Sequence, residues 1–454
     1  MEKMENEGRN LKRLVLVPGP FQGHLTPMLQ LATILKSKDF SITIAHTLFN
    51  SPDSSAHPDF TFLCIPDGLS EQEVGNPDLV SIMRRVNDNC KFSFKECLIQ
   101  GTNHTKLGDK ICCIIYDAIV YFSEAVARDL KIPSIAFHTS SAATTAVRPI
   151  LIQLMAQGHI PAPGTMLEVP VPLHQPLRFK DLPIFNVGSL DYFLEGVALT
   201  YNLRSSSAII LNTVHCLEES LLAQLRQKYQ VPIFPIGPLH KFSPTSAVSL
   251  LQEDTGCIPW LDKQTHNSVI YVSLGSVAHM NQDQLSEMAW GLANSKEPFL
   301  WVIRPGTIPG SEWTESMDEE FEECVKDRGC IVKWAPQKKV LAHDAVGGFW
   351  SHCGWNSTLE SICEGVPMIC QPCFGDQKVN ARYLTHEWMV GLDLEGEIER
   401  GAVERAVRTL MKEKEGEEMR QRVLDLKHKV DVSIGDGGSS CHYLSELAEL
   451  LTSF

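Results

Sequence analysis

Short, continuous apolar runs alternate with amphipathic helical patterns along almost the whole chain. Arg13–Pro18 and Phe40–Thr47 are apolar runs separated by a helix-like stretch, and Lys110–Asp117 and Ile132–Thr139 repeat the arrangement. Strands that are apolar along their whole length are buried on both faces. A sheet that helices cover on both faces is a doubly wound parallel sheet. The sequence therefore predicts an α/β fold.

The pattern is interrupted by a polar stretch with proline and serine at residues 240–249. Strand-like runs then resume, at Ser268–Ser276, Pro298–Pro305, Gly329–Pro336, Val346–Cys353 and Val366–Pro372. A chain of 454 residues is too long for a single hydrophobic core. We expect two doubly wound, Rossmann-like domains at residues 1–245 and 246–435. A C-terminal helix at residues 436–454 should pack back on the first domain.

Composition excludes several classes of partner. The formal net charge of −15 repels polyanions, so we expect no nucleic-acid partner. The first 13 residues are polar and lack the apolar core of a secretory signal peptide. The longest apolar runs are far too short to span a membrane. We therefore expect a cytoplasmic protein without a membrane span.

Fourteen cysteines are scattered along the chain, mostly within apolar runs. Those that we expect to be buried small hydrophobic residues include Cys112, Cys113, Cys330, Cys363 and Cys370. Burial as thiols agrees with a reducing compartment. Cys370 and Cys373 form a lone C-x-x-C pair, which without a second pair is a weak sign of a metal or redox site. Packing in the core is the favoured interpretation.

Residues that follow the predicted strands are the candidates for a ligand site, because open parallel sheets bind ligands outside the carboxyl ends of their strands. They are residues 19–27, Asp117, His138, Thr139, Ser276, residues 334–337 and residues 352–357. Two domains that each offer such an edge would form a cleft.

One of these segments combines several hydrogen-bond donors at the start of a helix. His352 and a glycine precede a helical pattern that opens with Asn356 and Ser357. A helix N-terminus presents unpaired backbone N–H groups and the positive end of the helix dipole, which together bind anions. With Ser276 as a further donor, the segment predicts a diphosphate site. Taken alone, Asn356 and Ser357 would also suit an ordinary helix cap.

The neighbouring residues are ambiguous when each is taken alone. Glu360 lies four residues after Asn356, on the same face of the helix, where its carboxylate could accept from two ribose hydroxyls. It would also favour the helix dipole. Trp334 could offer a flat face to a base or belong to the core. Asp376 and Gln377 begin another helix, where an acid is expected in any case.

The 44 residues Trp334–Gln377 closely resemble the signature of the plant UDP-dependent glycosyltransferases. The similarity extends to Phe21–Ala32 and Val272–Ser276, covers nearly the whole chain, and is greatest with the branch of cytokinin and diterpenoid glucosyltransferases. The resemblance implies the GT-B fold, a nucleotide sugar held by the second domain, inversion at the sugar carbon and a monomeric enzyme.

Carried over by position, the resemblance implies that Trp334 stacks on the uracil, that Gln337 lies close to the base and ribose, and that Glu360 binds the ribose hydroxyls. The residues that it implies for the diphosphate are Ser276, His352, Asn356 and Ser357. The expected partners are therefore a UDP-sugar donor and a small-molecule acceptor, the donor being a substrate and not a cofactor.

For the sugar, the resemblance implies contacts from Trp355, Asp376 and Gln377. A glutamine at the end of the signature usually accompanies glucose, whereas a histidine there suggests galactose. The chain contains no Asp-x-Asp motif, so we expect no metal ion on the diphosphate. The helix N-terminus and His352 would hold it instead.

The first domain must supply the chemistry for the acceptor. Taken alone, His24 would suit a helix start or the core, but the resemblance places His24 and Asp117 at the catalytic positions. A neutral imidazole can take the acceptor's hydroxyl proton while the oxygen attacks the sugar. A carboxylate on the other ring nitrogen fixes the tautomer and stabilises the imidazolium. One direct displacement then converts an α-linked donor into a β-linked product.

Residues expected near the sugar or the acceptor are Thr139, Phe21 and His138, with the stretches Met83–Phe94 and Phe185–Leu203. In the related family the position of Thr139 touches the sugar; alternatively, Thr139 caps a helix. Apolar and aromatic side chains in these stretches suit a flat or terpenoid-like acceptor. The presence of His24 favours hydroxyl acceptors, while nitrogen and carboxyl acceptors stay open.

Two other protein classes share doubly wound domains. A dinucleotide oxidoreductase would need G-x-G-x-x-G after the first strand, and the loop at residues 19–24 reads GPFQGH. A non-catalytic nucleotide-sugar-binding protein would keep the fold without turnover. His24 and Asp117 argue against that interpretation.

Overall fold

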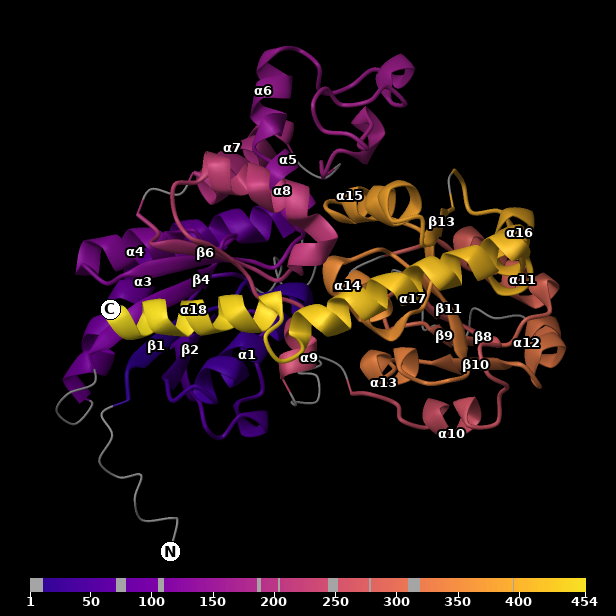
Figure 1. The fold of residues 1–454 in the computed structure, drawn as a ribbon, viewed down its shortest axis with the longest axis horizontal. Coiled ribbons are helices and arrows are strands. Elements are labelled where there is room, and N and C mark those ends of the chain that lie inside the picture. The colour runs from indigo at the N-terminus through magenta and orange to yellow at the C-terminus, as the bar shows by residue number, and fades with distance from the viewer. Residues whose placement is uncertain are drawn as a thin grey trace, which may run out of the picture. The chain divides into compact units, whose positions relative to one another are not determined.

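The computed structural model describes residues 11–70, 79–104, 110–185, 189–202, 205–243, 252–276, 279–308, 319–394 and 396–454. The chain divides into two compact units, each with its own parallel sheet (Figure 1). Unit 1 contains residues 1–158, 185–250 and 433–454, and unit 2 contains residues 159–184 and 251–432. The predicted boundary at residue 245 lies outside the described residues.

The sheet of unit 1 has seven parallel strands in the order β3-β2-β1-β4-β5-β6-β7. Its strands are β1 (Arg13–Val17), β2 (Ser41–Thr47), β3 (Thr61–Ile65), β4 (Ile111–Asp117), β5 (Ser134–His138), β6 (Ala208–Leu211) and β7 (Ile233–Pro235). The strand order reverses between β1 and β4, which are neighbours. In a doubly wound sheet the crevice at such a reversal is where ligands bind.

Helices cover both faces of this sheet. They are α1 (Gln22–Lys36), α3 (Leu79–His104), α4 (Phe122–Leu130), α5 (Ala142–Val147), α6 (Ile150–Ala156), α7 (Leu190–Tyr201), α8 (His215–Lys228), α9 (Leu239–Phe242) and α18 (Ser439–Ser453). Leu14 of β1 packs with α1 on one face, whereas Val15 packs with Phe94 of α3 on the other. Because both faces are covered, the strands are apolar without alternation.

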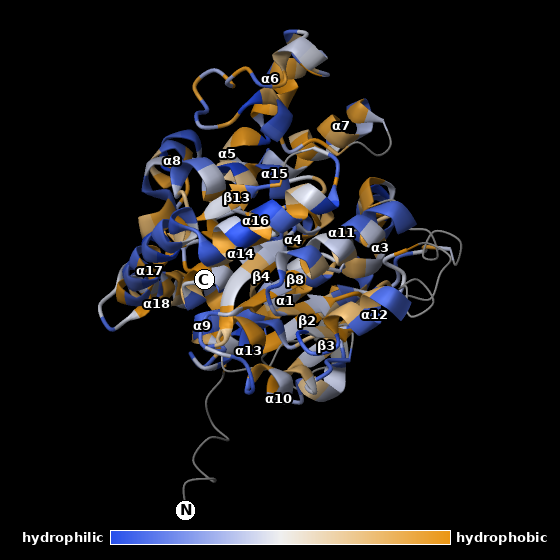
Figure 2. Ribbon diagram, turned by 90° about the vertical axis from the view of Figure 1, so that its right-hand side faces the viewer, coloured by the Kyte–Doolittle hydropathy of each residue, from blue (hydrophilic) through white to orange (hydrophobic). Residues whose placement is uncertain are grey.

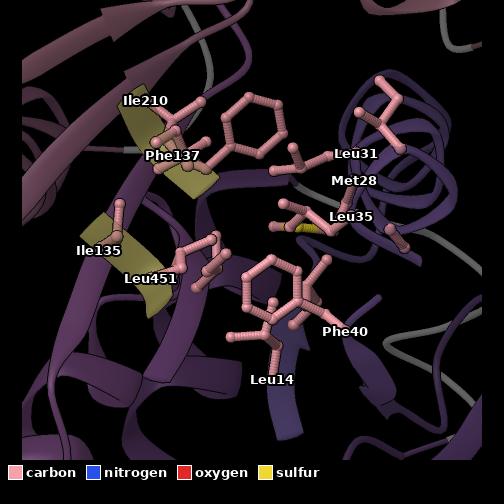
Figure 3. Packing of buried hydrophobic residues seen from close by; sticks show 14 of the residues in the cluster. Leu14, Met28, Leu31, Leu35, Phe40, Ile135, Phe137, Ile210 and Leu451 are labelled. Carbon is pink, nitrogen blue, oxygen red and sulfur yellow. The ribbon is translucent and has the colours of Figure 1, made fainter. Parts of the chain in front are cut away.

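The C-terminal helix α18 packs on unit 1. Leu444, Leu447 and Leu451 are buried in the same cluster as Leu14 and the apolar face of α1. Figure 3 shows Leu451 among the side chains of β1, α1 and β5. The spacing of three and four residues places the three leucines on one side of the helix. The prediction that the C-terminal helix returns to the first domain is therefore confirmed.

The sheet of unit 2 has six parallel strands in the order β10-β9-β8-β11-β12-β13. Its strands are β8 (Val269–Ser273), β9 (Phe299–Val302), β10 (Gly329–Val332), β11 (Val346–Ser351), β12 (Met368–Cys370) and β13 (Gly391–Asp393). Here the order reverses between β8 and β11. The candidate donor residues Ser276 and His352 follow these two strands.

The helices that begin in unit 2 surround this sheet. They are α10 (Cys257–Leu261), α11 (Gln282–Ser295), α12 (Glu319–Val325), α13 (Gln337–Leu341), α14 (Trp355–Glu364), α15 (Gln377–Arg382), a π-helical turn (Tyr383–Glu387), α16 (Arg400–Lys412) and α17 (Lys414–Ile434). In α16, Val403, Val407 and Leu410 are buried at helical spacing in the core of the unit. Figure 2 shows the resulting mixture of hydrophobic and hydrophilic residues on this helix.

All fourteen cysteines are free thiols. Four of the five expected in the core are buried, namely Cys112, Cys113, Cys363 and Cys370. The prediction for Cys330 is wrong, because β10 is an edge strand and leaves this side chain partly exposed. Cys373 is exposed. Among the described helices, none combines the length and apolar character that a membrane crossing requires.

Candidate active site

His24 and Asp117 meet at the edge of the sheet of unit 1. His24 lies in the first turn of α1, directly after β1, and Asp117 is the last residue of the neighbouring strand β4. Nδ1 of His24 lies 2.7 Å from Oδ2 of Asp117. The Asp117 side chain is 1% exposed, whereas that of His24 is 28% exposed. A buried carboxylate therefore holds one nitrogen of a partly exposed imidazole.

Thr139 contacts the same histidine nitrogen. Its Oγ1 lies 3.0 Å from Nδ1 of His24. Two oxygen acceptors around Nδ1 favour a proton on that nitrogen, so the tautomer assigned from this network leaves Nε2 as the basic nitrogen. Thr139 is not a helix cap, because Ser141 caps α5 and accepts from the backbone of Thr144. The sequence did not reveal the contact between Thr139 and His24, since it joins residues 115 positions apart.

The residues expected on the acceptor side lie at different depths. The ring of Phe21 stands edge-on to His24, with the centroids 6.1 Å apart. His138 is 3% exposed, and burial lowers its pKa to about 4, so the imidazole is neutral at pH 7. Its ring centroid lies 5.3 Å from that of Tyr201. Phe21 is therefore near His24, whereas His138 belongs to the interior of unit 1.

The two expected acceptor stretches come together through a cation–π contact. The guanidinium of Arg84, on α3, lies 4.2 Å from the ring centroid of Tyr192, on α7. Arg84 also lies 3.7 Å from Glu195 of α7. In the predicted stretch Phe185–Leu203, residues 186–188 and 203 lie outside the described part of the chain. The described parts of α3 and α7 are thus neighbours in unit 1.

In unit 2, His352 follows β11 and lies between two glycines. A Cβ atom on Gly354 would lie 2.5 Å from Nε2 of His352. A Cβ atom on Gly275, which has φ +77°, would lie 2.7 Å from the same nitrogen. Burial lowers the pKa of His352 to about 4. Among the described residues its buried Nδ1 has no hydrogen-bond partner. A neutral imidazole therefore fills the space that the missing Cβ atoms leave, next to the loop that carries Ser276.

The N-terminus of α14 begins at a glycine. Gly354 occupies the N-cap position, and Trp355, Asn356 and Ser357 form the first turn. The hydroxyl of Ser357 accepts a 2.9 Å hydrogen bond from Nε2 of Gln337. The N-cap position therefore supplies no side-chain acceptor to the backbone N–H groups of the first turn, an arrangement that suits an anion.

Gln337 joins this turn to the carboxylate expected to bind ribose. Its Nε2 donates to Oε2 of Glu360 at 2.7 Å, and its Oε1 accepts from the hydroxyl of Tyr271 at 3.3 Å. Burial raises the pKa of Glu360. Trp334 is half-buried, with its backbone carbonyl bonded to Asp254 at 2.8 Å. The indole therefore keeps exposed surface and is not part of the fully buried core.

The residues expected to contact the sugar lie around the start of α15. Asp376 is the N-cap of this helix and Gln377 is its first residue. Oε1 of Gln377 accepts from the backbone N–H of Cys373 at 2.8 Å and of Phe374 at 3.1 Å, which turns the amide nitrogen away from that loop. The Trp355 side chain is 3% exposed and lies near Trp388, so its indole is core.

Asn380 was not predicted from the sequence. Its Nδ2 donates to the carbonyl of Cys353 at 3.0 Å and lies 3.4 Å from Oδ2 of Asp376. It therefore links the loop before α14 to the N-cap of α15. The available signal was its spacing of four residues from Asp376, which places both on one face of a helix.

The comparisons with known proteins agree on one family. Residues 210–431 match the family model "UDP-glucoronosyl and UDP-glucosyl transferase". UDP-glycosyltransferase 76E1 of Arabidopsis thaliana is 49% identical over 97% of this chain and 97% of its own. Flavonol 3-O-glucosyltransferase UGT76E12 of the same plant is 50% identical, again over 97% of both chains. The chain belongs to the plant UDP-dependent glycosyltransferases and is a transferase that uses a UDP-sugar donor.

Solved structures show the same architecture. UGT2 of Phytolacca americana, complexed with UDP-2fluoro-glucose and pterostilbene, is 29% identical with a TM-score of 0.80, over 97% of this chain and 99% of its own. Os79 of O. sativa in complex with UDP is 27% identical, also with a TM-score of 0.80, over 96% of this chain and 100% of its own. The predicted fold, two Rossmann-like domains of the GT-B type, is confirmed.

The described residues contain no group of three His, Cys, Asp or Glu side chains arranged to hold a metal ion.

Proposed function

We propose that this enzyme transfers glucose from UDP-glucose to a hydroxyl group of a small hydrophobic plant metabolite, with inversion at the sugar carbon. His24 is the general base and Asp117 orients it. The 2.7 Å contact between these side chains, at the point where the strand order of unit 1 reverses, carries the proposal. It is supported by UGT76E12, a relative named as a flavonol 3-O-glucosyltransferase.

In the proposed reaction, Nε2 of His24 takes the proton of the acceptor hydroxyl while that oxygen attacks the anomeric carbon of glucose. A bond forms between the acceptor oxygen and this carbon, and the bond from the carbon to the diphosphate oxygen breaks. UDP leaves with the electron pair. Asp117 stabilises the imidazolium, and general base catalysis of this kind contributes about 10²–10⁴ in rate. A single displacement gives a β-glucoside.

Unit 2 holds the donor in this proposal. Trp334 stacks on the uracil, Gln337 positions the carboxylate of Glu360, and that carboxylate accepts from the ribose hydroxyls. The N-terminus of α14, with glycine as its N-cap, stabilises the charge that develops on the leaving diphosphate. The side chains that share this work are Ser276, His352, Asn356 and Ser357.

The sugar lies against the start of α15 in the same proposal. Asp376 and the amide nitrogen of Gln377 bind its hydroxyl groups, and glutamine at this position favours glucose. Because the Trp355 indole is buried, a contact from this residue would come from its backbone. We also infer that the enzyme works as a monomer in the cytoplasm, a reducing compartment that suits its fourteen free thiols.

The acceptor site, as proposed, belongs to unit 1 around His24, Thr139 and Phe21, with α3 and α7. His138 acts from the interior by supporting this site. The test is UDP release from UDP-glucose with phenolic, terpenoid, N-heterocyclic and carboxylic acceptors, followed by NMR assignment of the product's linkage and anomeric configuration. UDP-galactose is the donor control.

β-Glucosides of hydroxyl acceptors would support the proposal. Products formed only at nitrogen or carboxyl groups would replace the hydroxyl acceptor with one of those linkages. Binding of UDP-glucose without acceptor-dependent release of UDP would favour a non-catalytic nucleotide-sugar-binding protein instead.

A further inference from the structure

Residues 159–184, here called the crossover segment, connect two parts of unit 1 in the sequence but belong to unit 2. The segment folds back on itself, since the backbone of Val171 bonds to Leu177 at 2.8 Å and that of Phe179 bonds to Val169 at 3.1 Å. It ends in a 3-10 turn, Phe179–Asp181. This turn packs against α15, the helix that begins with the proposed sugar-binding residues.

The turn presents a buried carboxylate with a fixed orientation. The side chain of Asp181 is 8% exposed. Its Oδ2 accepts from the backbone N–H of Arg178 at 2.8 Å and from Nε at 2.9 Å, and its Oδ1 accepts from Nη2 at 3.1 Å. A buried carboxylate that accepts several hydrogen bonds from one neighbouring residue is held in one orientation.

A cationic side chain of α15, that of Arg382, faces this carboxylate. Nε of Arg382 lies 3.7 Å from Oδ2 of Asp181 and donates to the backbone carbonyl of Pro176 at 2.8 Å. Lys378 lies four residues before Arg382, on the same face of the helix. Burial lowers the pKa of Lys378, and Asp181 opposes that shift, so the two charges interact. The ion pair of Arg382 with Asp181 and its bond to Pro176 therefore attach the crossover segment to α15.

α15 depends on such contacts, because its six residues and the π-helical turn Tyr383–Glu387 that follows directly make only a short helical segment. A helix this short is not stable by itself in water and takes its position from packing. Arg178 also lies 4.0 Å from Asp393, at the end of β13, so the network reaches the sheet as well as the helix.

We propose that Asp181 is a positioning residue for recognition of the donor sugar. Through its ion pair with Arg382 it holds α15 so that Asp376 and Gln377 meet the hexose hydroxyls. This inference rests on the proposed function, which assigns the sugar to those two residues. The uracil and ribose residues lie on other elements, around α13 and α14. Asn380 joins α15 to the carbonyl of Cys353 in the loop before α14, so loss of Asp181 weakens the sugar contacts more than the nucleotide contacts.

The test compares dissociation constants for UDP, UDP-glucose and UDP-galactose, measured by calorimetry, together with kcat/KM for hydrolysis of UDP-glucose. The variants are Asp181→Asn and Arg382→Gln. The matched control is Glu168→Gln, which lies in the crossover segment, is 66% exposed and pairs with Arg178 and Lys180. Displacement of reacting groups by about 1 Å costs about 10²-fold in rate, so we expect kcat/KM to fall by about tenfold or more in both variants.

In both variants the preference for UDP-glucose over UDP-galactose should shrink. The dissociation constant for UDP should stay within about twofold of the wild-type value, well below the tenfold change that corresponds to about 1.4 kcal/mol. Glu168→Gln should behave as wild type. If Asp181→Asn is insoluble, Arg382→Gln, which removes the charge opposite Asp181, provides the same readouts.

An equal loss of affinity for UDP and UDP-glucose would show a merely structural role and overturn the inference. The inference would also be overturned if Asp181→Asn and Arg382→Gln kept the wild-type sugar preference while Gln377→Ala lost it. That result would leave the proposed function standing. If Gln377→Ala also keeps the preference, the sugar subsite of the proposed function is wrong and the inference falls with it.

Discussion

His24 and Asp117 are 93 positions apart in the sequence, yet Nδ1 of one lies 2.7 Å from Oδ2 of the other. Both residues follow strands that are neighbours in the sheet, and the order of the strands reverses between them. Asp117 is also fixed by the backbone N–H of Ile119, which donates to its other oxygen at 3.1 Å. The carboxylate therefore has one defined orientation toward the imidazole.

Asp117→Asn should lower kcat by about 10²–10⁴ with little change in the affinity for UDP, because the amide cannot stabilise an imidazolium as a carboxylate does. Steady-state kinetics of UDP release would measure it. Asp67→Asn is the control, since Asp67 is a buried acid of the same unit whose carboxylate accepts from the backbone N–H groups of Phe49 and Leu69. The Asp67→Asn variant should be less stable than wild type, while its kcat stays close to the wild-type value. Equal kcat losses in both variants would contradict the orienting role.

Gly354→Ala should weaken UDP binding by about tenfold or more, because the new Cβ would lie 2.5 Å from Nε2 of His352 and displace the ring. Gly164→Ala is a matched control in the same unit, since a Cβ atom at that position would meet nothing within 4 Å. Calorimetry with UDP compares the two. Wild-type affinity in Gly354→Ala would remove His352 from the diphosphate site.

Glu360→Gln should reduce the preference of the enzyme for UDP over 2′-deoxy-UDP. Hydrogen bonds to a charged acceptor contribute about 1.5–3 kcal/mol, so wild type should prefer the ribonucleotide by about tenfold or more. The neutral amide should lose most of that ratio. Competition binding with both nucleotides measures it. A ratio that is the same in wild type and variant would exclude Glu360 as the ribose ligand.

His138→Phe should make the stability of unit 1 less sensitive to acid. Burial lowers the pKa of His138 from 6.5 to about 4 in the folded chain. Between those values the unfolded chain binds a proton that the folded chain does not, so stability falls as the pH falls, by up to about 1.4 kcal/mol per pH unit. Phenylalanine keeps an aromatic ring beside Tyr201 and removes the proton.

Urea unfolding at pH 7 and pH 5 checks this. From pH 7 to pH 5 the variant should gain about 1–2 kcal/mol relative to wild type. A difference between the two proteins that does not change with pH would show that the folded and unfolded chains protonate His138 alike.

The sequence predicted those parts of the molecule that depend on local pattern. Continuous apolar runs identified strands such as β4 and β11 because helices cover both faces of each sheet. The rule that ligands lie beyond the carboxyl ends of strands selected His24 and His352, which indeed follow β1 and β11. The assignment of these residues to catalysis and donor binding stays a prediction.

Contacts between segments that are distant in the chain could not be predicted from the sequence. The bond from Thr139 to His24, and the ion pair of Asp181 with Arg382, join residues whose spacing follows no helical or strand period. The crossover segment lies early in the chain but belongs to unit 2, which composition does not reveal. The sequence places a glycine beside His352 in the loop before α14. Only the fold shows that the imidazole of His352 occupies the space beside Gly354.

The most direct test of the central claim is acceptor-dependent UDP release by His24→Ala, measured with the acceptor that wild type uses best. The structure predicts a loss of about 10²–10⁴ in kcat together with wild-type affinity for UDP-glucose, because the imidazole acts on the acceptor proton and not on the donor. Release of UDP at the wild-type rate by His24→Ala would contradict base catalysis by this residue.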